Sequence, residues 1–459
     1  MGNLLSEPIT EKETEEGITI SGLAYAASSM QGWRTHMEDA HICESYLTVK
    51  VPISNSTEST SFVAVGDDNK TQHKGILAVA ESIHEVIVLQ DHSIFAVFDG
   101  HGGEFAAKYA AKHFVRVLTS LPSFQNYAML FHESNRTDSA SSESEQETLA
   151  FKMKLSSFLE QSLRDAFYEV DNELLATCRQ PQGSSNSRKR SIALVGNECS
   201  QKPNTTVMPV HGQSIQDLVR EIVQRSEADE ISDDDNPTNG ETNCGSSGTT
   251  AVVVLVTPTQ ILCANAGDSR AIFSSTKSQS IPLSYDHKPS DEYELTRIVN
   301  AGGYVSNDRI NGDLAVARGL GDFRFKTMQN LTPDLQKVTA LPDIIALNRN
   351  VEEDLFMFIG CDGIWDVCSN ENAAQTILGI FNEGESSLGL VCEEMMDLCL
   401  NKGSKDNMTA VLVAFPALKT KFEHLAQNTT TVNGVMARRQ ERARVAEESR
   451  KTRQHYRHR

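Results

Sequence analysis

The sequence has 459 residues, of which 39% are hydrophobic, and its 42 Lys and Arg against 62 Asp and Glu give a formal net charge of −20. This length and composition suit one large catalytic domain or two ordinary ones and exclude disorder throughout. The negative charge argues against direct nucleic-acid binding, because Lys and Arg hold phosphate backbones. No stretch approaches the roughly 20 apolar residues of a membrane span, and no secretory signal begins the chain. We therefore expect an intracellular protein without an integral membrane span.

Hydrophobic periodicity predicts alternating strands and helices. In chain order they are strands at 19–26 and 93–98, helices at 103–118 and 151–175, strands at 250–256 and 260–265, a helix at 290–300, a strand at 355–359, helices at 370–381 and 388–400, and a strand at 408–415. Strands outnumber the crossover helices that a parallel sheet needs. The sequence therefore predicts an α+β fold with mixed or antiparallel sheets flanked by helices.

Composition also divides the chain into segments. Residues 227–241 carry seven acidic and no basic residues, a pattern typical of a solvated loop. We predict a catalytic domain at 19–417, interrupted by insertions at about 55–74 and at 122–243. The second insertion is acidic and, apart from the helix at 151–175, predicted to be largely disordered. An N-terminal segment at 1–18 and a basic tail at 418–459 flank this domain.

Five acidic patches lie where predicted strands meet turns. They contain Arg34, Glu38 and Asp39; Asp99, Gly100 and His101; Asp268; Asp362 and Asp366; and Asp406. A single Asp-Gly pair is more often a structural turn than a functional site. Here two apolar strands each end in Asp-Gly, and further acids come from separate segments. This recurrence favours a shared carboxylate cluster neutralised by divalent metal ions, which prefer oxygen ligands.

In this order, the patches closely resemble the metal-dependent type 2C protein Ser/Thr phosphatases. The resemblance covers most of the chain outside the insertions and tails, and the segments 245–252, 286–289 and 308–322 match as well. The acidic insertion, the start MGNLLSEP and the segment 330–333 ahead of 340–344 look most like the gamma isoform of that family.

The resemblance implies two antiparallel β-sheets in a central sandwich flanked by helices, and two Mg²⁺ or Mn²⁺ ions per subunit with a third, weaker ion. The positions that match the family's metal site are Glu38, Asp39, Asp99, Gly100, Asp268, Asp362 and Asp406. Among them Asp99 would bridge the two metals, Gly100 would contribute its carbonyl, and Asp39 would act through water. Asp268, together with Asp362, matches the site of the third ion.

The implied reaction is hydrolysis of phosphoserine and phosphothreonine in proteins by direct attack of a metal-bridging hydroxide. Arg34 matches the residue that grips the substrate phosphate, which suits its planar fork. His101 is then the general acid for the leaving oxygen, since it titrates near neutral pH. Asp366 is expected to support the metal shell. No cysteine is followed by arginine at C-x5-R spacing, in agreement with a reaction without a phosphocysteine. We expect a monomer whose partners are phosphorylated protein substrates.

Two other functional classes fit parts of the sequence. A catalytically weak scaffold would keep the fold but lose ligands, whereas all the motif positions are present. A nucleic-acid or chromatin-associated protein would use the basic tail, where residues 437–459 hold nine Lys and Arg against three Glu. Tyr456 is the only aromatic residue there, and a solvated charged helix is the commoner meaning of such a run.

Short motifs at both ends bear on localisation. The start Met1-Gly2-Asn3-Leu4-Leu5-Ser6 fits the N-myristoylation pattern, which by itself gives only weak membrane association. The basic tail and the cluster at 188–190 fit nuclear import signals, while paired charges on a solvated helix explain the tail equally well. With the resemblance to the gamma isoform, these clusters predict a nuclear protein with a cytoplasmic pool.

Overall fold

The computed structural model describes residues 4–52, 84–136, 145–179 and 246–422. By its contacts the chain divides into a main unit, Met1–Leu175 with Asn243–Arg459, and a second unit, Ala176–Thr242. Only the last turn of one helix is described in the second unit. The predicted loop at 55–74, the acidic run at 227–241 and the basic clusters at 188–190 and 437–459 lie outside the described residues.

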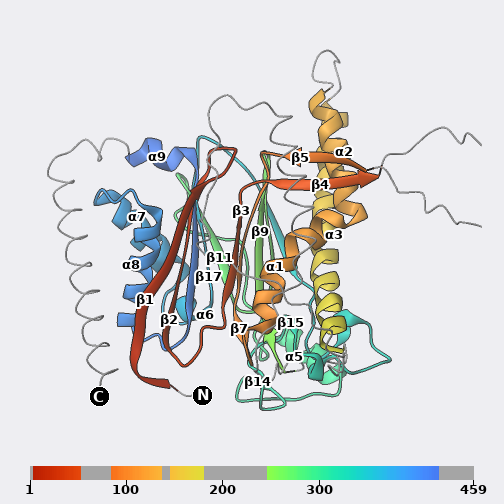
Figure 1. The fold of residues 1–459 in the computed structure, drawn as a ribbon, viewed down its shortest axis with the longest axis vertical. Coiled ribbons are helices and arrows are strands. Elements are labelled where there is room, and N and C mark those ends of the chain that lie inside the picture. Colours follow the sequence, from red (N-terminus) through yellow and green to blue (C-terminus); the bar gives the residue numbers. More distant parts are fainter. Residues whose placement is uncertain (1–3, 53–83, 137–144, 180–245, 423–459) are drawn as a thin grey trace, which may run out of the picture. The chain divides into compact units, whose positions relative to one another are not determined.

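Two antiparallel sheets lie at the centre of the main unit (Figure 1). The six-stranded sheet consists, in spatial order, of β1 (Leu4–Ile18), β2 (Ala24–Arg34), β18 (Met408–Ala414), β17 (Asp354–Gly360), β11 (Arg270–Ser275) and β12 (Ile281–Pro282). The five-stranded sheet consists of β16 (Asp343–Asn348), β10 (Gln260–Ala266), β9 (Ala251–Val256), β6 (Ser93–Phe98) and β3 (Ala40–Glu44). This arrangement confirms the predicted fold class.

Burial of both faces explains why β9 is apolar along its whole length. Side chains alternate between the two faces of a strand. Val252 and Val254 belong to the core between the sheets, where they meet Met357 of the opposite sheet. Val253 and Leu255 belong to the core beneath the helices on the outer face. The uniformly apolar sequence of β9 therefore reflects its position between two hydrophobic cores.

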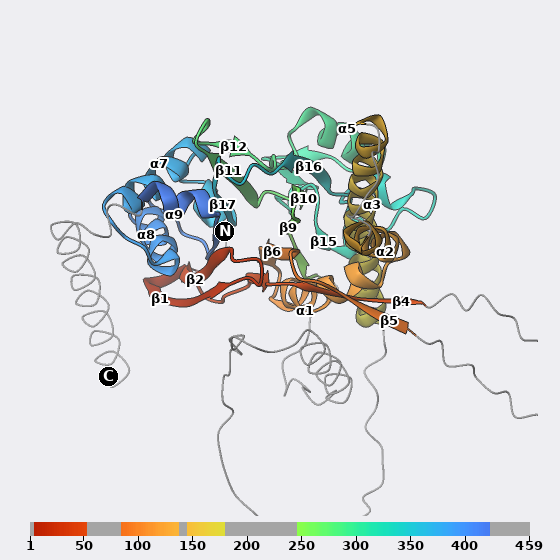
Figure 2. The same cartoon turned by 90° about the horizontal axis from the view of Figure 1, so that it is seen from above.

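Helices cover the outer face of each sheet (Figure 2). The five-stranded sheet is covered by α1 (Phe105–Ser120), α2 (Pro122–Arg136) and α3 (Glu145–Arg179), and the six-stranded sheet by α6 (Asp362–Trp365), α7 (Asn370–Asn382), α8 (Leu388–Asn401) and α9 (Pro416–Phe422). Two smaller sheets have two strands each: β4 (Leu47–Pro52) with β5 (His84–Leu89), and β13 (Val305–Ser306) with β14 (Arg309–Ile310). A three-stranded sheet consists of β15 (Leu320–Gly321), β8 (Gly248–Thr249) and β7 (Gly100–His101). The remaining elements are the helix α5 (Glu292–Asn300) and the 3-10 turns Phe323–Phe325 and Pro333–Leu335.

The structure differs from the sequence-based expectations mainly at the edges. The strand predicted at 19–26 is wrong over its first five residues, which form a turn in which Gly22 has a φ of +87°. Ahead of that turn, β1 joins the six-stranded sheet, although the sequence assigned it to a separate N-terminal segment. Its many glutamates are compatible with an edge strand, whose outer side faces water. Likewise α2 buries Phe124 and Tyr127 in the core, although it falls within the predicted insertion.

A buried ion network joins α5 to the segments that follow it. Glu294, Arg297 and Arg318 are all buried, and Glu294 bonds both guanidinium groups. Arg318 Nη2 lies 2.7 Å from Glu294 Oε1. Arg297 also donates to the carbonyl of Ala317, at 2.6 Å. Burial raises the pKa of Glu294, but the hydrogen bond from Arg318 and the charges of both arginines outweigh it, so the net pKa is lowered.

The Glu294→Gln variant is expected to lower the free energy of unfolding by about 3–5 kcal/mol, because it leaves the buried Arg297 guanidinium without a carboxylate and leaves Arg318 with Asp343 alone. Urea denaturation at neutral pH measures this loss. The matched control is Glu292→Gln, which removes an exposed carboxylate from the same helix. Because the folded-state pKa of Glu294 is lowered, its contribution is present above the unfolded-state pKa and is lost as the pH falls through the folded-state value. Equal losses in the two variants would contradict the assignment.

Candidate metal centre

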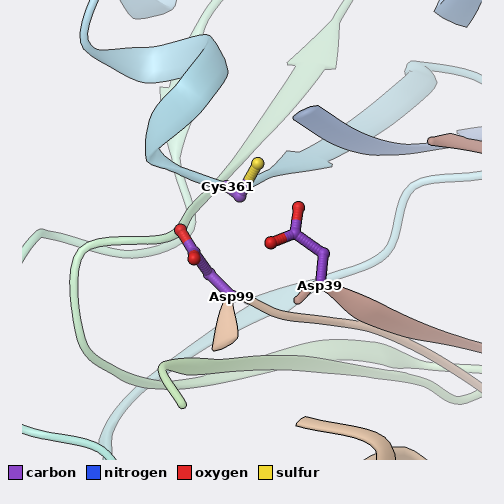
Figure 3. Close-up of side chains that lie close together, drawn as sticks. All are labelled: Asp39, Asp99 and Cys361. Atoms are coloured by element: carbon purple, nitrogen blue, oxygen red, sulfur yellow. The ribbon is translucent and has the colours of Figure 1, made fainter. Parts of the chain in front are cut away.

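Acidic side chains converge where the ends of the two central sheets meet. β3 and β6 are antiparallel, and Ala40 pairs with Phe98, so Asp39 before β3 lies beside Asp99 after β6. Cys361 follows β17 of the other sheet and faces the same point (Figure 3). One side-chain ligand atom from each of Asp39, Asp99 and Cys361 lies within 4.8 Å of the other two. Strand register therefore places groups from three distant parts of the sequence in one cluster.

The electrostatics extend this cluster to five carboxylates. Burial raises the pKa of Asp99 well above its usual value, and so does repulsion from the other members, which are Asp362, Asp39, Asp268 and Asp406. Burial likewise raises the pKa of Asp39 to about 6. The ionised forms of these side chains are thus destabilised in the absence of compensating cations.

Individual contacts show which ligand atoms are available. Asp39 Oδ2 accepts a hydrogen bond from Thr409 Oγ1 at 2.7 Å, while its Oδ1 is buried without a partner. Cys361 Sγ donates to the carbonyl of Asn407 at 3.4 Å and accepts from the Thr409 amide at 3.2 Å. The thiol therefore bonds backbone groups and the Asp39 side chain, and the oxygen atoms that could hold a metal ion belong to the carboxylates.

Two of the five carboxylates have cationic partners. Arg34 Nη2 bonds Asp406, and Lys288 Nζ lies 2.5 Å from Asp268 Oδ2. Within the described ranges, Asp39, Asp99 and Asp362 form no ion pair with lysine or arginine. Three neighbouring carboxylates without cations are costly to bury, and hard divalent cations with oxygen ligands would remove that cost. The residues present therefore fit Mg²⁺ or Mn²⁺.

The remaining predicted ligands lie at the rim of this cluster. Glu38 Oε1 accepts a hydrogen bond from the Gly103 amide at 3.2 Å, and its charge contributes to the raised pKa of Asp39. Gly100 starts β7, and a Cβ atom there would overlap the carbonyl oxygen of Glu38. Only glycine therefore fits at this position. The ion pair between Asp268 and Lys288 was not predicted, although Lys288 belongs to the segment 286–289, which resembles the phosphatase family.

His101 has a partner that the sequence did not predict. Its Nε2 lies 2.7 Å from Asp322 Oδ2, and Asp322 is completely buried, with Oδ1 unpartnered. β7 carries His101 and β15 directly precedes Asp322, and both strands pair with β8. Burial lowers the pKa of His101, but attraction to the Asp322 carboxylate outweighs it and raises the pKa overall. The only signal in the sequence was that Asp322 ends a segment resembling the phosphatase family.

Arg34 borders a solvent-accessible cavity beside the cluster. It ends β2, and its side chain is 39% exposed, so the guanidinium can reach a ligand from solvent. The cavity has a volume of about 350 Å³ and is lined by Leu4, Arg34, Gly363, Asp366, Val367, Gly403, Ser404, Lys405 and Asp406. The predicted phosphate-binding residue and one predicted metal ligand thus share an open pocket.

Sequence comparison assigns this arrangement to a family. Residues 140–408, more than half of the chain, match the family model described as protein phosphatase 2C. The chain belongs to the protein phosphatase 2C family. It is 32% identical over 421 residues to "Probable protein phosphatase 2C 21" of Arabidopsis thaliana, with 90% of this chain and 93% of that protein covered.

Two further relatives agree on the family. The chain is 31% identical to "Protein phosphatase ppm-1.A" of Caenorhabditis elegans, with 91% of this chain covered, and spans 64% of that protein's length. It is 29% identical to human "Protein phosphatase 1A", with 91% of this chain and 76% of that protein covered. These matches confirm the prediction of a protein phosphatase. They support the family and no particular isoform within it.

Solved structures support the fold. The "serine-threonine phosphatase 2C from Toxoplasma gondii" superimposes with a TM-score of 0.52 at 18% identity, and the alignment covers 90% of this chain and 98% of that one. A second Toxoplasma gondii structure, titled as a phosphatase from a pathogenic strain, gives a TM-score of 0.51 at 19% identity and covers 88% and 96%.

Proposed function

We propose that this chain hydrolyses phosphoserine and phosphothreonine in proteins, with Mg²⁺ or Mn²⁺ bound at the carboxylate cluster. The observation that carries this proposal is the group of carboxylates formed by the buried Asp39 and the half-buried Asp99 and Asp362. They lack a cationic partner among the described residues, in a chain of the protein phosphatase 2C family. We place two ions at this cluster and a third, weaker ion at Asp268.

The proposed ligands come from both sheets. Asp99 and Asp362 would hold the ions directly, with Asp406, Glu38 and the carbonyl of Gly100 completing the shell and Asp39 acting through water. Bound divalent cations would lower the pKa of a water molecule and neutralise charge on the phosphate. Asp268 would have to exchange its ion pair with Lys288 for a metal ion, which agrees with weaker binding there.

The chain's own residues supply phosphate binding and proton transfer. Arg34 presents a half-exposed guanidinium that can grip phosphate oxygens with two N–H groups. Its bond to Asp406 ties its position to the metal shell. His101 would donate a proton to the departing serine or threonine oxygen. Because Asp322 engages Nε2, Nδ1 is the ring nitrogen that remains for this transfer.

Phosphate release from a phosphothreonine peptide tests the proposal, with Mn²⁺ or Mg²⁺ added to EDTA-treated protein. Activity should be absent in EDTA and return with either cation. Calorimetric titration of Mn²⁺ supplies a readout that does not depend on turnover. Full activity in EDTA, or no Mn²⁺ binding by folded protein, would refute metal-dependent hydrolysis.

We also propose that Gly2 is N-myristoylated, on the evidence of the motif that begins the sequence. One acyl chain gives marginal binding, and Glu7, Glu11 and Glu13 oppose an anionic surface. No helix in the described parts of the chain is both long and apolar enough to cross a membrane. The intact mass of protein from eukaryotic cells should therefore show a myristoyl increment, and the protein should stay largely in the soluble fraction. An unmodified Gly2 would contradict the prediction.

We further propose a gamma-type isoform assignment, on the basis of the acidic insertion, the start MGNLLSEP and the segment 330–333 ahead of 340–344. Together with the basic clusters, this assignment leads us to propose nuclear enrichment with a cytoplasmic pool. Truncation after Phe422 should keep phosphatase activity within about twofold and reduce nuclear enrichment, because it removes only residues beyond α9. Phe422 itself must stay, since its ring stacks on Phe381 at 5.9 Å and Leu418 is buried. Fluorescence microscopy and phosphate release measure the two outcomes. Unchanged nuclear enrichment, with 188–190 also neutralised, would contradict the import hypothesis.

A further inference from the structure

Two cysteines and a lysine meet behind the metal centre, at the ends of two helices. Cys368 lies one residue before the N-cap of α7, Cys399 lies in the last turn of α8, and Lys402 caps the C-terminus of α8. Lys402 Nζ is 3.8 Å from Cys368 Sγ, and the Cys399 side chain hydrogen-bonds Cys368. Both cysteines are buried, while Lys402 is exposed.

The surroundings of the two thiols shift their pKa values in opposite directions. The hydrogen bond from Cys399 lowers the pKa of Cys368, and Lys402 adds to this against the effect of burial, so the pKa falls to about 6. The N-terminus of α7 also favours a thiolate at this position. The hydrogen bond to Cys368, together with burial, raises the pKa of Cys399. A cation therefore lies beside Cys368, whose pKa is lowered, and the thiol of Cys399 is hydrogen-bonded to it.

The other free cysteines of the described ranges lack this environment. Cys43, Cys263, Cys361 and Cys392 all have pKa values raised by burial. Cys392 is the most instructive comparison, because it lies on α8 with Cys399 and is also buried. A cation beside a hydrogen-bonded pair of thiols is therefore specific to Cys368 and Cys399 among these residues.

We propose that Cys368 and Cys399 form a modification site that hydroperoxides convert to a reversible disulfide. The Cys368 thiolate attacks hydrogen peroxide, the O–O bond breaks, and Cys368 sulfenic acid forms as hydroxide leaves and is protonated to water. Cys399 then loses its proton and attacks the Cys368 sulfur. The S–S bond forms, and the sulfenic oxygen leaves with that proton as a second water. The two thiols lose two electrons in total, and the peroxide gains them.

The site lies directly behind residues that the proposed metal centre uses. Cys399 Sγ is 4.0 Å from the carbonyl oxygen of Ile364, in the short helix α6 that begins at Asp362. Ser404, in the loop between Lys402 and Asp406, donates to the carbonyl of Gly363 in the same helix, at 2.6 Å. The disulfide would therefore form against the helix and loop that carry two proposed metal ligands.

Peptide mapping of the reduced full-length chain tests the site. After brief treatment with hydrogen peroxide at pH 7 and blocking with N-ethylmaleimide, we expect a Cys368–Cys399 cross-link that dithiothreitol removes. In Cys399→Ser the sulfenic acid on Cys368 has no resolving thiol, so dimedone should label it. This readout does not depend on phosphatase activity, so its failure is distinguishable from a failure of the proposed function.

Two further variants distinguish specific oxidation of Cys368 and Cys399 from general oxidation of cysteines. Lys402→Met removes the exposed cation and should slow cross-linking by roughly 3- to 10-fold, because less of Cys368 is ionised. The matched control Cys392→Ser should leave the rate unchanged. Absence of the cross-link in the wild type, or an equal rate in Lys402→Met, would overturn the proposal.

Discussion

Asp99→Asn is expected to lower kcat/KM on a phosphopeptide at least a thousandfold while the chain remains folded. Asp99 directly follows the fully buried strand β6 and is repelled by four neighbouring carboxylates. An amide oxygen is a weaker ligand than a carboxylate, and the ions of a two-metal site carry most of the charge stabilisation in such a reaction. Phosphate release and Mn²⁺ titration on the same sample measure the effect.

The same variant should raise the melting temperature of the metal-free protein. The pKa of Asp99 is raised in the folded state, so its ionised form opposes folding, and this cost grows as the pH rises above the unfolded-state pKa. Asparagine removes the charge at every pH, and each kcal/mol relieved is worth about 2 °C or less in a chain of this length, because the entropy of unfolding grows with size. Mn²⁺ should stabilise the wild type and have little effect on the variant.

The matched control is Asp91→Asn, which changes an exposed carboxylate near the opposite end of β6. It should keep wild-type activity and Mn²⁺ affinity. Retention of full activity by Asp99→Asn, or loss of both activity and folded structure, would contradict the assignment of Asp99 as a ligand rather than a structural residue.

Asp322→Asn is expected to slow hydrolysis of phosphopeptides by about 10²-fold or more, and to slow p-nitrophenyl phosphate much less. The reason is that Asp322 holds His101 and favours its protonated form. A general acid matters most for a poor leaving group such as serine, and contributes about 10²–10⁴-fold. His101→Ala should show the same substrate dependence. Both variants are compared through their rates on the two substrates.

The pH profile supplies a second readout of this pair. Attraction to Asp322 raises the pKa of His101, so the proton that His101 donates is retained to higher pH and is lost as the pH rises through that value. In Asp322→Asn the alkaline decline in rate should therefore move to lower pH. Asp313→Asn, a change to an exposed carboxylate, should leave the profile unchanged. Equal losses on the two substrates, with no change in the profile, would rule out the positioning role.

The local pattern of apolar and polar residues predicted many of the strands and helices correctly. The strands β6, β9, β17 and β18 were predicted within a residue or two, because each is a short apolar run with polar turn residues on at least one side. The helices α7 and α8 were predicted equally well. The edge strand β1 and the helix α2 were not, since a charged edge strand lacks clear alternation and α2 was assigned to an insertion by its position between segments rich in polar residues.

By itself the sequence determined which residue types were available for the chemistry. Asp99 and Asp362 each follow an apolar strand, and this is a local property of the chain. Only the tertiary structure decided which side chains meet. His101 and Asp322 are 221 positions apart in the sequence. Asp268 forms an ion pair with Lys288 instead of facing solvent. Cys368 and Cys399 come together from the ends of α7 and α8. No local pattern reports such pairs, because strand register and helix packing between distant segments set them, and burial then makes each pair's charges and hydrogen bonds strong.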